Sequence, residues 1–520
     1  MKKHLPYLLA ITFIFILILS IIGLGGEYPI GDDWSYNLAL KHLVDYNEVK
    51  LTGWTSMPLV TQLYLGKLFS FGEFSYVNAR ISTIFLSYLS LILVYFLSFR
   101  FTKNYFTSLI ASLLLLALPE YLLLSFSFNT DVQYLFWFLL TLLTLLKYLE
   151  TNKYSWLTLT SIFYIISILL RDLTFIIPIA LITYEIINKI KFKAINFKNI
   201  VVSLILIIVF ILTSYLFRQF LEHNHNLPIL FDLQKKNLLT TLSDPISTIT
   251  QIIKSGFKII IYLGIFLFTP IFLFSNKYSK LKLKKILLSL LIAMALTSIL
   301  ILFQNEKILT YLFYDYILEA KYIINDIKFQ IFAYSLITLG MFSTSYYFIN
   351  KQFQFGKDKL LILLIGLLYI TLFSLVFLFT RYLIILVPLF FIALFNVKKS
   401  NLKVGITYLL ALFIVISIPM VKDFNEINSN KLKVINRLKS ENIKTENISA
   451  GFEFSGLNNY SDSKKIIEDY YWDRNTIYLI STQKKQEYKT IDSVKIQIYN
   501  IFKNDYYLYI QKNKRHLPLK

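Results

Sequence analysis

The chain has 520 residues, of which 56% are hydrophobic and 16% are charged, and its mean hydropathy is +0.59. These values exclude an ordinary soluble globular protein. The formal net charge of +22 would suggest nucleic-acid binding in a soluble protein. Here most Lys and Arg residues lie in short segments between apolar runs, so they indicate membrane topology and not a nucleic-acid partner. The absence of cysteine excludes disulfides and thiolate catalysis.

Apolar runs recur from the N-terminus to about residue 420. A helix of about 20 residues crosses the hydrocarbon core of a bilayer, which is about 30 Å thick. We therefore predict an α-helical polytopic membrane protein with about thirteen transmembrane helices. The predicted spans are 5–23, 80–99, 105–124, 132–149, 156–170, 173–188, 199–218, 257–275, 286–303, 330–349, 360–379, 382–396 and 403–420.

The positive charges orient these spans. With a cytoplasmic N-terminus, every Lys-rich connection falls on the cytoplasmic side, as the positive-inside rule requires. The stretch 156–188 is predicted to cross twice, turning at Arg171 and Asp172, because a single crossing would place the Lys-rich segment 189–198 outside. Ionisable groups held within a membrane are costly and are usually functional.

An odd number of spans places the polar tail on the outer face, together with the first outer loop, 24–75. The tail has a helical pattern at 430–440 and strand-like runs at 447–452, 476–481, 494–502 and 506–510. We predict a membrane domain, 1–420, and a small extracytoplasmic α/β domain, 421–520. The predicted location is a bacterial inner (plasma) membrane.

Charged residues gather on this outer face. Two adjacent carboxylates, Asp32 and Asp33, open the first outer loop, and segments 34–44 and 57–71 behind them have the spacing of amphipathic helices lying in the interface. Trp34, Tyr36 and Trp54 are interpreted as members of an interfacial aromatic belt. The same topology places further polar residues on this face: Asp131, Arg171, Asp172, Arg381 and Tyr382.

Carboxylates beside cations at a lipid–water boundary suit the transfer of a sugar from a polyprenyl phosphate to an acceptor hydroxyl. An ionised Asp can take the hydroxyl proton as the oxygen attacks the anomeric carbon. Arg171 and Arg381 can stabilise the charge that develops on the lipid phosphate. Each also has a simpler interpretation, since Arg at the end of a span often only anchors it in the interface.

This arrangement resembles the GT-C membrane glycosyltransferases, in particular the branch of protein O-mannosyltransferases and aminoarabinose transferases. The resemblance covers most of the chain. It implies that the acidic pair Asp32 and Asp33 is catalytic, with Asp32, the first residue, as the base, although Asp33 stands where Glu is commoner. It also implies a second functional carboxylate at Asp131 and lipid-phosphate binding by Arg171, Arg381 and Tyr382.

The family's first loop continues through a proline pair, of which this chain has only Pro58. In the tail, residues 450–456 are similar to a segment of bacterial members that have a small external domain. The resemblance implies a polyprenyl-phosphate sugar donor, an acceptor that is a protein, lipid or glycan, and contact with membrane lipids. Family members differ in whether they need a divalent cation, so no cofactor is assigned and a cation remains open.

Two other classes of function stay open at this point. A transporter or lipid flippase would also have charges within its spans, but an odd span count and an external domain argue against it. An envelope glycan polymerase or ligase would use the same lipid carriers. His223 and His225 have a spacing found in metal sites, but no further ligands cluster nearby in the sequence.

Overall fold

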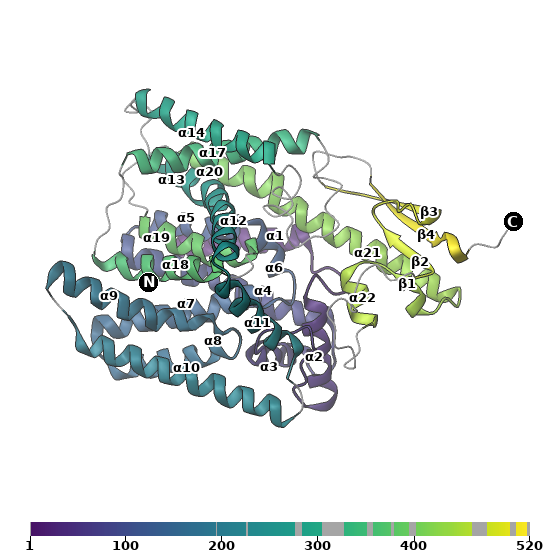
Figure 1. Cartoon of the computed structure of the whole chain (residues 1–520), viewed down its shortest axis with the longest axis horizontal. Coiled ribbons are helices and arrows are strands. Elements are labelled where there is room, and N and C mark those ends of the chain that lie inside the picture. The colour runs from purple at the N-terminus through teal and green to yellow at the C-terminus, as the bar shows by residue number, and fades with distance from the viewer. Residues whose placement is uncertain are drawn as a thin grey trace.

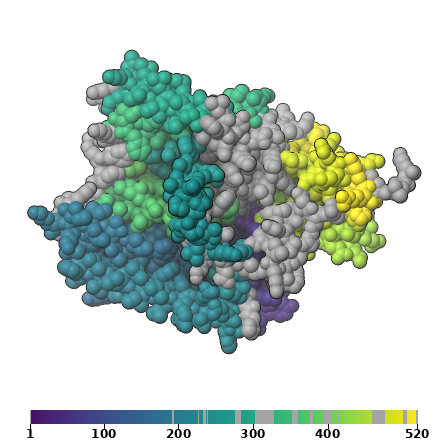
Figure 2. Space-filling view, in the orientation of Figure 1, coloured from purple at the N-terminus to yellow at the C-terminus, as the bar shows by residue number. Residues whose placement is uncertain are grey.

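The computed structural model describes ten stretches of the chain: residues 2–193, 195–224, 227–275, 283–303, 327–350, 357–375, 379–394, 402–459, 476–499 and 506–516. These stretches form a helical bundle with a small mixed sheet at one end (Figure 1). In the space-filling view, the last strands project from that end of the molecule (Figure 2).

The first half of the bundle contains long apolar helices joined by short connections. Three of these helices, α4, α7 and α9, end at a residue in the left-handed conformation: Lys103, Asn152 and Lys193. The helices are α1 (Leu5–Ile22), α4 (Tyr76–Thr102), α5 (Tyr105–Leu116), α6 (Pro119–Ser125), α7 (Thr130–Thr151), α8 (Tyr154–Ile168), η1 (Asp172–Phe175), α9 (Ile176–Phe192) and α10 (Phe197–His223).

The second half of the bundle is less regular, and two of its helices contain a π-helical segment. The helices are α11 (Ile229–Ser243), α12 (Pro245–Leu263), π-helix η2 (Gly264–Phe268), α13 (Thr269–Ser275), α14 (Leu283–Phe303), α17 (Ile327–Ile349), α18 (Lys357–Leu375), η4 (Thr380–Ile385), α19 (Leu386–Leu394), α20 (Leu402–Leu412), π-helix η5 (Phe413–Ser417) and α21 (Ile418–Ser440).

The helical membrane architecture is confirmed. Within the described residues, seven helices are long and apolar enough to cross a membrane, or eight if the bent pair α5 and α6 forms one span. Shorter apolar helices, including α8 and the segment 380–394, fall below that length. The predicted total of about thirteen spans stays a prediction.

One predicted span is broken. The run 105–124 was expected to be a single helix, but α5 and α6 meet at an angle of 72°. Pro119 is the first residue of α6, and Leu118 before it has an extended backbone (φ −69°, ψ 124°). Proline disfavours helical geometry in the preceding residue and lacks the N–H needed to continue a helix, which explains the break.

The first outer loop contains the two expected helices, α2 (Asp33–Tyr46) and α3 (Val60–Ser70). Helix α2 packs against α3, and α3 packs against α4, through a separate apolar cluster that includes Leu40, Leu43 and Leu63. In Figure 1 they lie at the same end of the bundle as the sheet. The loop is therefore a packed part of the fold that can hold a site in place.

The C-terminal region is α/β, as predicted. Strands β1 (Ile448–Ser449), β2 (Tyr478–Ser481), β3 (Tyr488–Ile496) and β4 (Tyr506–Asn513) form a sheet of order β1-β2-β4-β3, with β1 parallel to β2 and the other pairs antiparallel. Helix α22 (Phe452–Asn459) and two short turns, η6 (Thr445–Asn447) and η8 (Lys514–His516), complete it.

Two expected boundaries in this region differ from the structure. Strand β3 begins at Tyr488, before the predicted 494–502 run, whose last residues lie outside the described stretches. The expected domain boundary at 420/421 falls inside α21, which runs without a break from the last apolar helix toward the sheet. The separate domain 421–520 stays a prediction.

Two glycines allow close helix packing in the second half of the bundle. A Cβ added at Gly340 of α17 would lie 2.8 Å from backbone atoms of Gly264 and Ile265. Backbone atoms cannot move aside as a flexible side chain can, so the contact requires glycine. This contact brings α17 against the π-helix η2.

We predict that Gly340→Ala destabilises the protein by about 1–3 kcal/mol, because the added methyl overpacks this contact. Thermal unfolding of the purified protein in lipid nanodiscs measures the effect. Gly256→Ala is the matched control, because an added Cβ there meets nothing within 4 Å. Equal melting temperatures for the two variants would contradict the prediction.

Candidate active site

A tight turn leads into α2, and Asp32 is the N-cap residue of this helix. Gly31 has φ of 59°, in the left-handed region that glycine adopts without a Cβ penalty. The backbone N–H of Ile30 donates to Asp33 Oδ1 at 2.5 Å, and the backbone N–H of Asp33 donates to Ile30 O at 3.3 Å. Both bonds close the turn, so the position of the Asp32 side chain is set by backbone geometry.

Asp33 joins this turn to the segment before α7. Its side chain is 1% exposed, and its Oδ2 accepts the backbone N–H of Phe128 at 2.9 Å. Burial raises the pKa of Asp33 to about 7, although the nearby Arg80 and the two backbone donors act to lower it. With both oxygens committed to backbone donors, Asp33 holds two parts of the site together.

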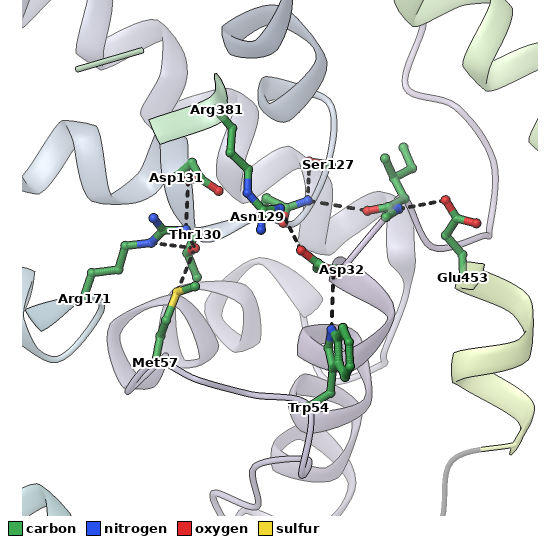
Figure 3. Close-up of polar contacts among 12 residues, drawn as sticks. Asp32, Trp54, Met57, Ser127, Asn129, Thr130, Asp131, Arg171, Arg381 and Glu453 are labelled. Carbon is green, nitrogen blue, oxygen red and sulfur yellow. Dashed lines mark hydrogen bonds and ion pairs between the residues drawn. The ribbon is translucent and has the colours of Figure 1, made fainter. Parts of the chain in front are cut away.

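Asp32 pairs with Arg381, 349 positions along the chain. Arg381 Nη1 lies 2.7 Å from Asp32 Oδ2, and the indole Nε1 of Trp54 donates to Asp32 Oδ1 at 3.3 Å (Figure 3). Arg381 comes from η4, and its side chain is nearly buried, whereas that of Asp32 is partly exposed. Asp32 therefore lies at an accessible edge of the site.

A second ion pair lies close by. Arg171 Nη2 is 2.9 Å from Asp131 Oδ1, and both side chains are buried. Arg171 also donates to Thr130 Oγ1 through Nε at 2.9 Å, and that hydroxyl contacts Met57 Sδ at 3.4 Å (Figure 3). Within the described part of the chain, Asp131 Oδ2 has no hydrogen-bond partner. One oxygen of this buried carboxylate is thus available to a ligand.

Tyr382 connects the two pairs. The guanidinium carbons of Arg171 and Arg381 lie 5.4 Å and 5.5 Å from the centroid of its ring. Tyr36 of α2 interacts electrostatically with the charged groups of both pairs. Its pKa is raised above the ordinary value, mainly because the side chain is buried. Its hydroxyl therefore stays neutral and can donate a hydrogen bond. Two cations, two carboxylates and two phenols converge here.

The structure thus brings together six residues that were predicted to share the outer face: Asp32, Asp33, Asp131, Arg171, Arg381 and Tyr382. Their chemical roles stay predictions. Asp172 lies outside this group. It is exposed, and the neighbouring Arg171 forms its ion pair with Asp131. Trp34, expected in an interfacial belt, is fully buried against Trp54 and Phe452.

Two contributors to the site were missed in the sequence. Thr130 receives Arg171, and Glu453 of α22 accepts the backbone N–H of Gly31 at 3.3 Å (Figure 3). Thr130 adjoins Asp131 and could have been included as its neighbour. The contact of Glu453 joins residues 422 positions apart, and no local pattern indicates it.

No metal centre is assigned. Among the described residues, no group of three or more His, Asp or Glu side chains is arranged to hold an ion. His225 lies outside the described residues, so the His223/His225 spacing is not tested. The question of a divalent cation therefore stays open.

Residues 57–216 match the family model described as dolichyl-phosphate-mannose-protein mannosyltransferase. The match confirms the GT-C resemblance. The matched segment contains Asp131 and Arg171 and supports a membrane glycosyltransferase as the class of enzyme. No curated protein matches the chain.

Solved structures of two proteins are similar to this chain at low identity. ArnT from Cupriavidus metallidurans bound to undecaprenyl phosphate gives a TM-score of 0.43 at 10% identity, covering 97% of this chain and 98% of that chain. Its apo form gives 0.41 at 10% identity, covering 88% and 84%. The archaeal oligosaccharyltransferase AglB from Archaeoglobus fulgidus, in complex with an inhibitory peptide and a dolichol-phosphate, gives 0.33 at 13% identity, covering 81% and 55%.

The raised pKa of Asp33 predicts a pH dependence of stability. A buried carboxyl whose folded pKa is about 7 and whose unfolded pKa is 3.8 contributes stability below about pH 4 that is lost as the pH rises through 7. We expect Asp33→Asn to remove this dependence. The measurement is the melting temperature of both proteins from pH 4 to pH 8, and parallel curves would contradict the expected role of Asp33.

Proposed function

We propose that this protein transfers a sugar from a polyprenyl-phosphate donor to an acceptor hydroxyl on the outer face of the membrane. The observation that carries the proposal is the pair of carboxylate–arginine contacts around the ring of Tyr382. The GT-C resemblance supports the donor class, and the undecaprenyl phosphate in the similar ArnT structure is in keeping with it. An extracytoplasmic site follows from the predicted topology.

In the proposed reaction, Asp32 takes the proton of the acceptor hydroxyl. The acceptor oxygen forms a bond to the anomeric carbon, while the bond from that carbon to the phosphate oxygen breaks. The electron pair leaves with the polyprenyl phosphate. Asp32 is preferred over Asp33 as the base because Asp33 has both oxygens bound to backbone N–H groups, whereas Asp32 is partly exposed.

Arg171 and Arg381 receive the lipid phosphate in this proposal. Each guanidinium presents several donors in a planar fork that matches phosphate geometry. A bound phosphate would compete with Asp32 for Arg381, so donor binding frees the Asp32 carboxylate for the acceptor. Asp131 keeps Arg171 oriented through the 2.9 Å contact, and Tyr382 packs against both arginines.

We predict that Asp32→Asn lowers sugar transfer by about 10²–10⁴-fold, the usual contribution of a general base. Protein level should stay near that of the native protein, and affinity for undecaprenyl phosphate should not fall, because Asp32 competes with the phosphate for Arg381. The measurement is the change in envelope glycans, followed by mass spectrometry, in cells that express each variant. Asp492→Asn, at an exposed carboxylate paired with Arg437, is the matched control. Full turnover by Asp32→Asn would remove the proposed base.

We also predict that Arg381→Lys and Arg171→Lys each weaken binding of undecaprenyl phosphate by about tenfold, because Lys keeps the charge but loses the planar fork. Titration of the purified variants in nanodiscs measures the dissociation constant. Arg437→Lys, in the exposed pair with Asp492, should bind as the native protein does. Unchanged affinity in both site variants would contradict phosphate binding by these arginines.

A further inference from the structure

A pocket of about 450 Å³ lies beside α2, and no member of the two ion pairs lines it. It is formed by segments of the outer loop before and after α2, by helix α2 itself, by the first residue of α4 and by α22 of the C-terminal region. Its lining includes Glu27, Asn37, Lys41, Phe74, Tyr76 and Leu457.

Asn37 is the residue that points to a ligand. Its side chain is 1% exposed, and within the described structure neither its amide nitrogen nor its amide oxygen has a hydrogen-bond partner. Buried polar groups in native proteins almost always have a partner. An amide offers two donors and an acceptor, so it matches a hydroxyl group, which both donates and accepts.

The rest of the lining suits a sugar. The rings of Phe74 and Tyr76 meet edge to face with centroids 5.0 Å apart and offer apolar surface. Glu27 is already held by Ser75 Oγ at 2.7 Å and by the backbone N–H of Tyr76 at 2.8 Å. Lys41 is exposed at the rim. A few placed polar groups on an apolar lining are typical of a site for a small polar ligand.

Helix α22 is fixed as one wall of this pocket. A Cβ added at Gly456 would lie 2.5–2.8 Å from three atoms of the Trp34 indole, so this glycine lets α22 pack directly on α2. Phe452 packs against Trp34 and Trp54, with ring centroids 6.2 Å and 5.9 Å away. These contacts hold Leu457 at the pocket edge.

Helical geometry separates the pocket from the candidate base. At 100° per residue, Asn37 lies about 140° and Lys41 about 180° around α2 from Asp32, whereas Tyr36 shares the side of Asp32. A helix with its side chains is about 10–12 Å across, so a single sugar ring cannot occupy the pocket and reach Asp32. A group bound here is therefore remote from the reacting hydroxyl.

We propose that the pocket between α2 and α22 binds one saccharide unit of a glycan acceptor whose reacting hydroxyl belongs to a different unit. This inference rests on the proposed function, and it names the acceptor class as a glycan of at least two sugar units. The C-terminal region then supplies a wall of the acceptor site.

The test uses the full-length protein in nanodiscs and saturation-transfer NMR with cellobiose, chitobiose and methyl α-mannopyranoside as probes. We expect at least one probe to bind. Its signal should fall at least fivefold in Leu457→Trp, which fills the pocket from α22, and in Asn37→Leu, which replaces the amide by an apolar side chain that also branches at Cγ. Leu68→Trp, at an exposed leucine of α3, is the matched control and should bind normally.

Asn37→Leu should melt no lower than the native protein, because it removes an unsatisfied buried amide. Absence of binding by every probe, or an equal loss in Leu68→Trp, would overturn the proposal. So would binding of a Ser/Thr-rich peptide, but of no saccharide, that is lost in Leu457→Trp. Undecaprenyl phosphate titrated into the same samples tests the proposed function separately, because the native protein must bind the lipid whatever the pocket does.

Discussion

The carboxylate of Asp33 holds the candidate site together. It accepts one backbone N–H from its own turn and another from Phe128, so the first outer loop is fastened to the segment that leads into α7. Asp32 comes directly before Asp33, and Asp131 comes three residues after Phe128. The Asp33 carboxylate is buried, and burying its charge costs free energy. The raised pKa of Asp33 reflects this cost.

The two ion pairs differ in a way that suits separate roles. Asp131 and Arg171 are both buried, and breaking such a pair leaves an uncompensated charge in a low-dielectric setting. Asp32 is the more exposed member of the other pair, so water or a ligand can replace its partner at lower cost. The buried pair therefore forms a fixed support, and the partly exposed pair is the one that ligands can exchange.

The sequence predicted the helical membrane class, the amphipathic helices of the first loop and the charged residues of one face. Hydropathy and the spacing of apolar residues carry that information locally. It could not predict which Arg meets which Asp, because Asp32 and Arg381 are 349 positions apart. The contact of Asp33 with the distant N–H of Phe128 could not be predicted either, because the pattern Ile-Gly-Asp-Asp indicates only the turn. Pro119 could have indicated the broken helix, but the prediction followed the length of the apolar run 105–124 and gave one span.

The continuous helix from residue 404 to 440 has a consequence for how the chain can vary. It begins as the last apolar span and continues toward the sheet, and in Figure 1 it points toward the end where α22 meets α2. In a continuous helix, one inserted residue would rotate all later residues by about 100° around the helix axis and move them about 1.5 Å along it. Such an insertion would carry Gly456 away from Trp34. The number of residues in this helix is therefore constrained by the contact between α22 and α2, even where the individual side chains of the helix are exposed.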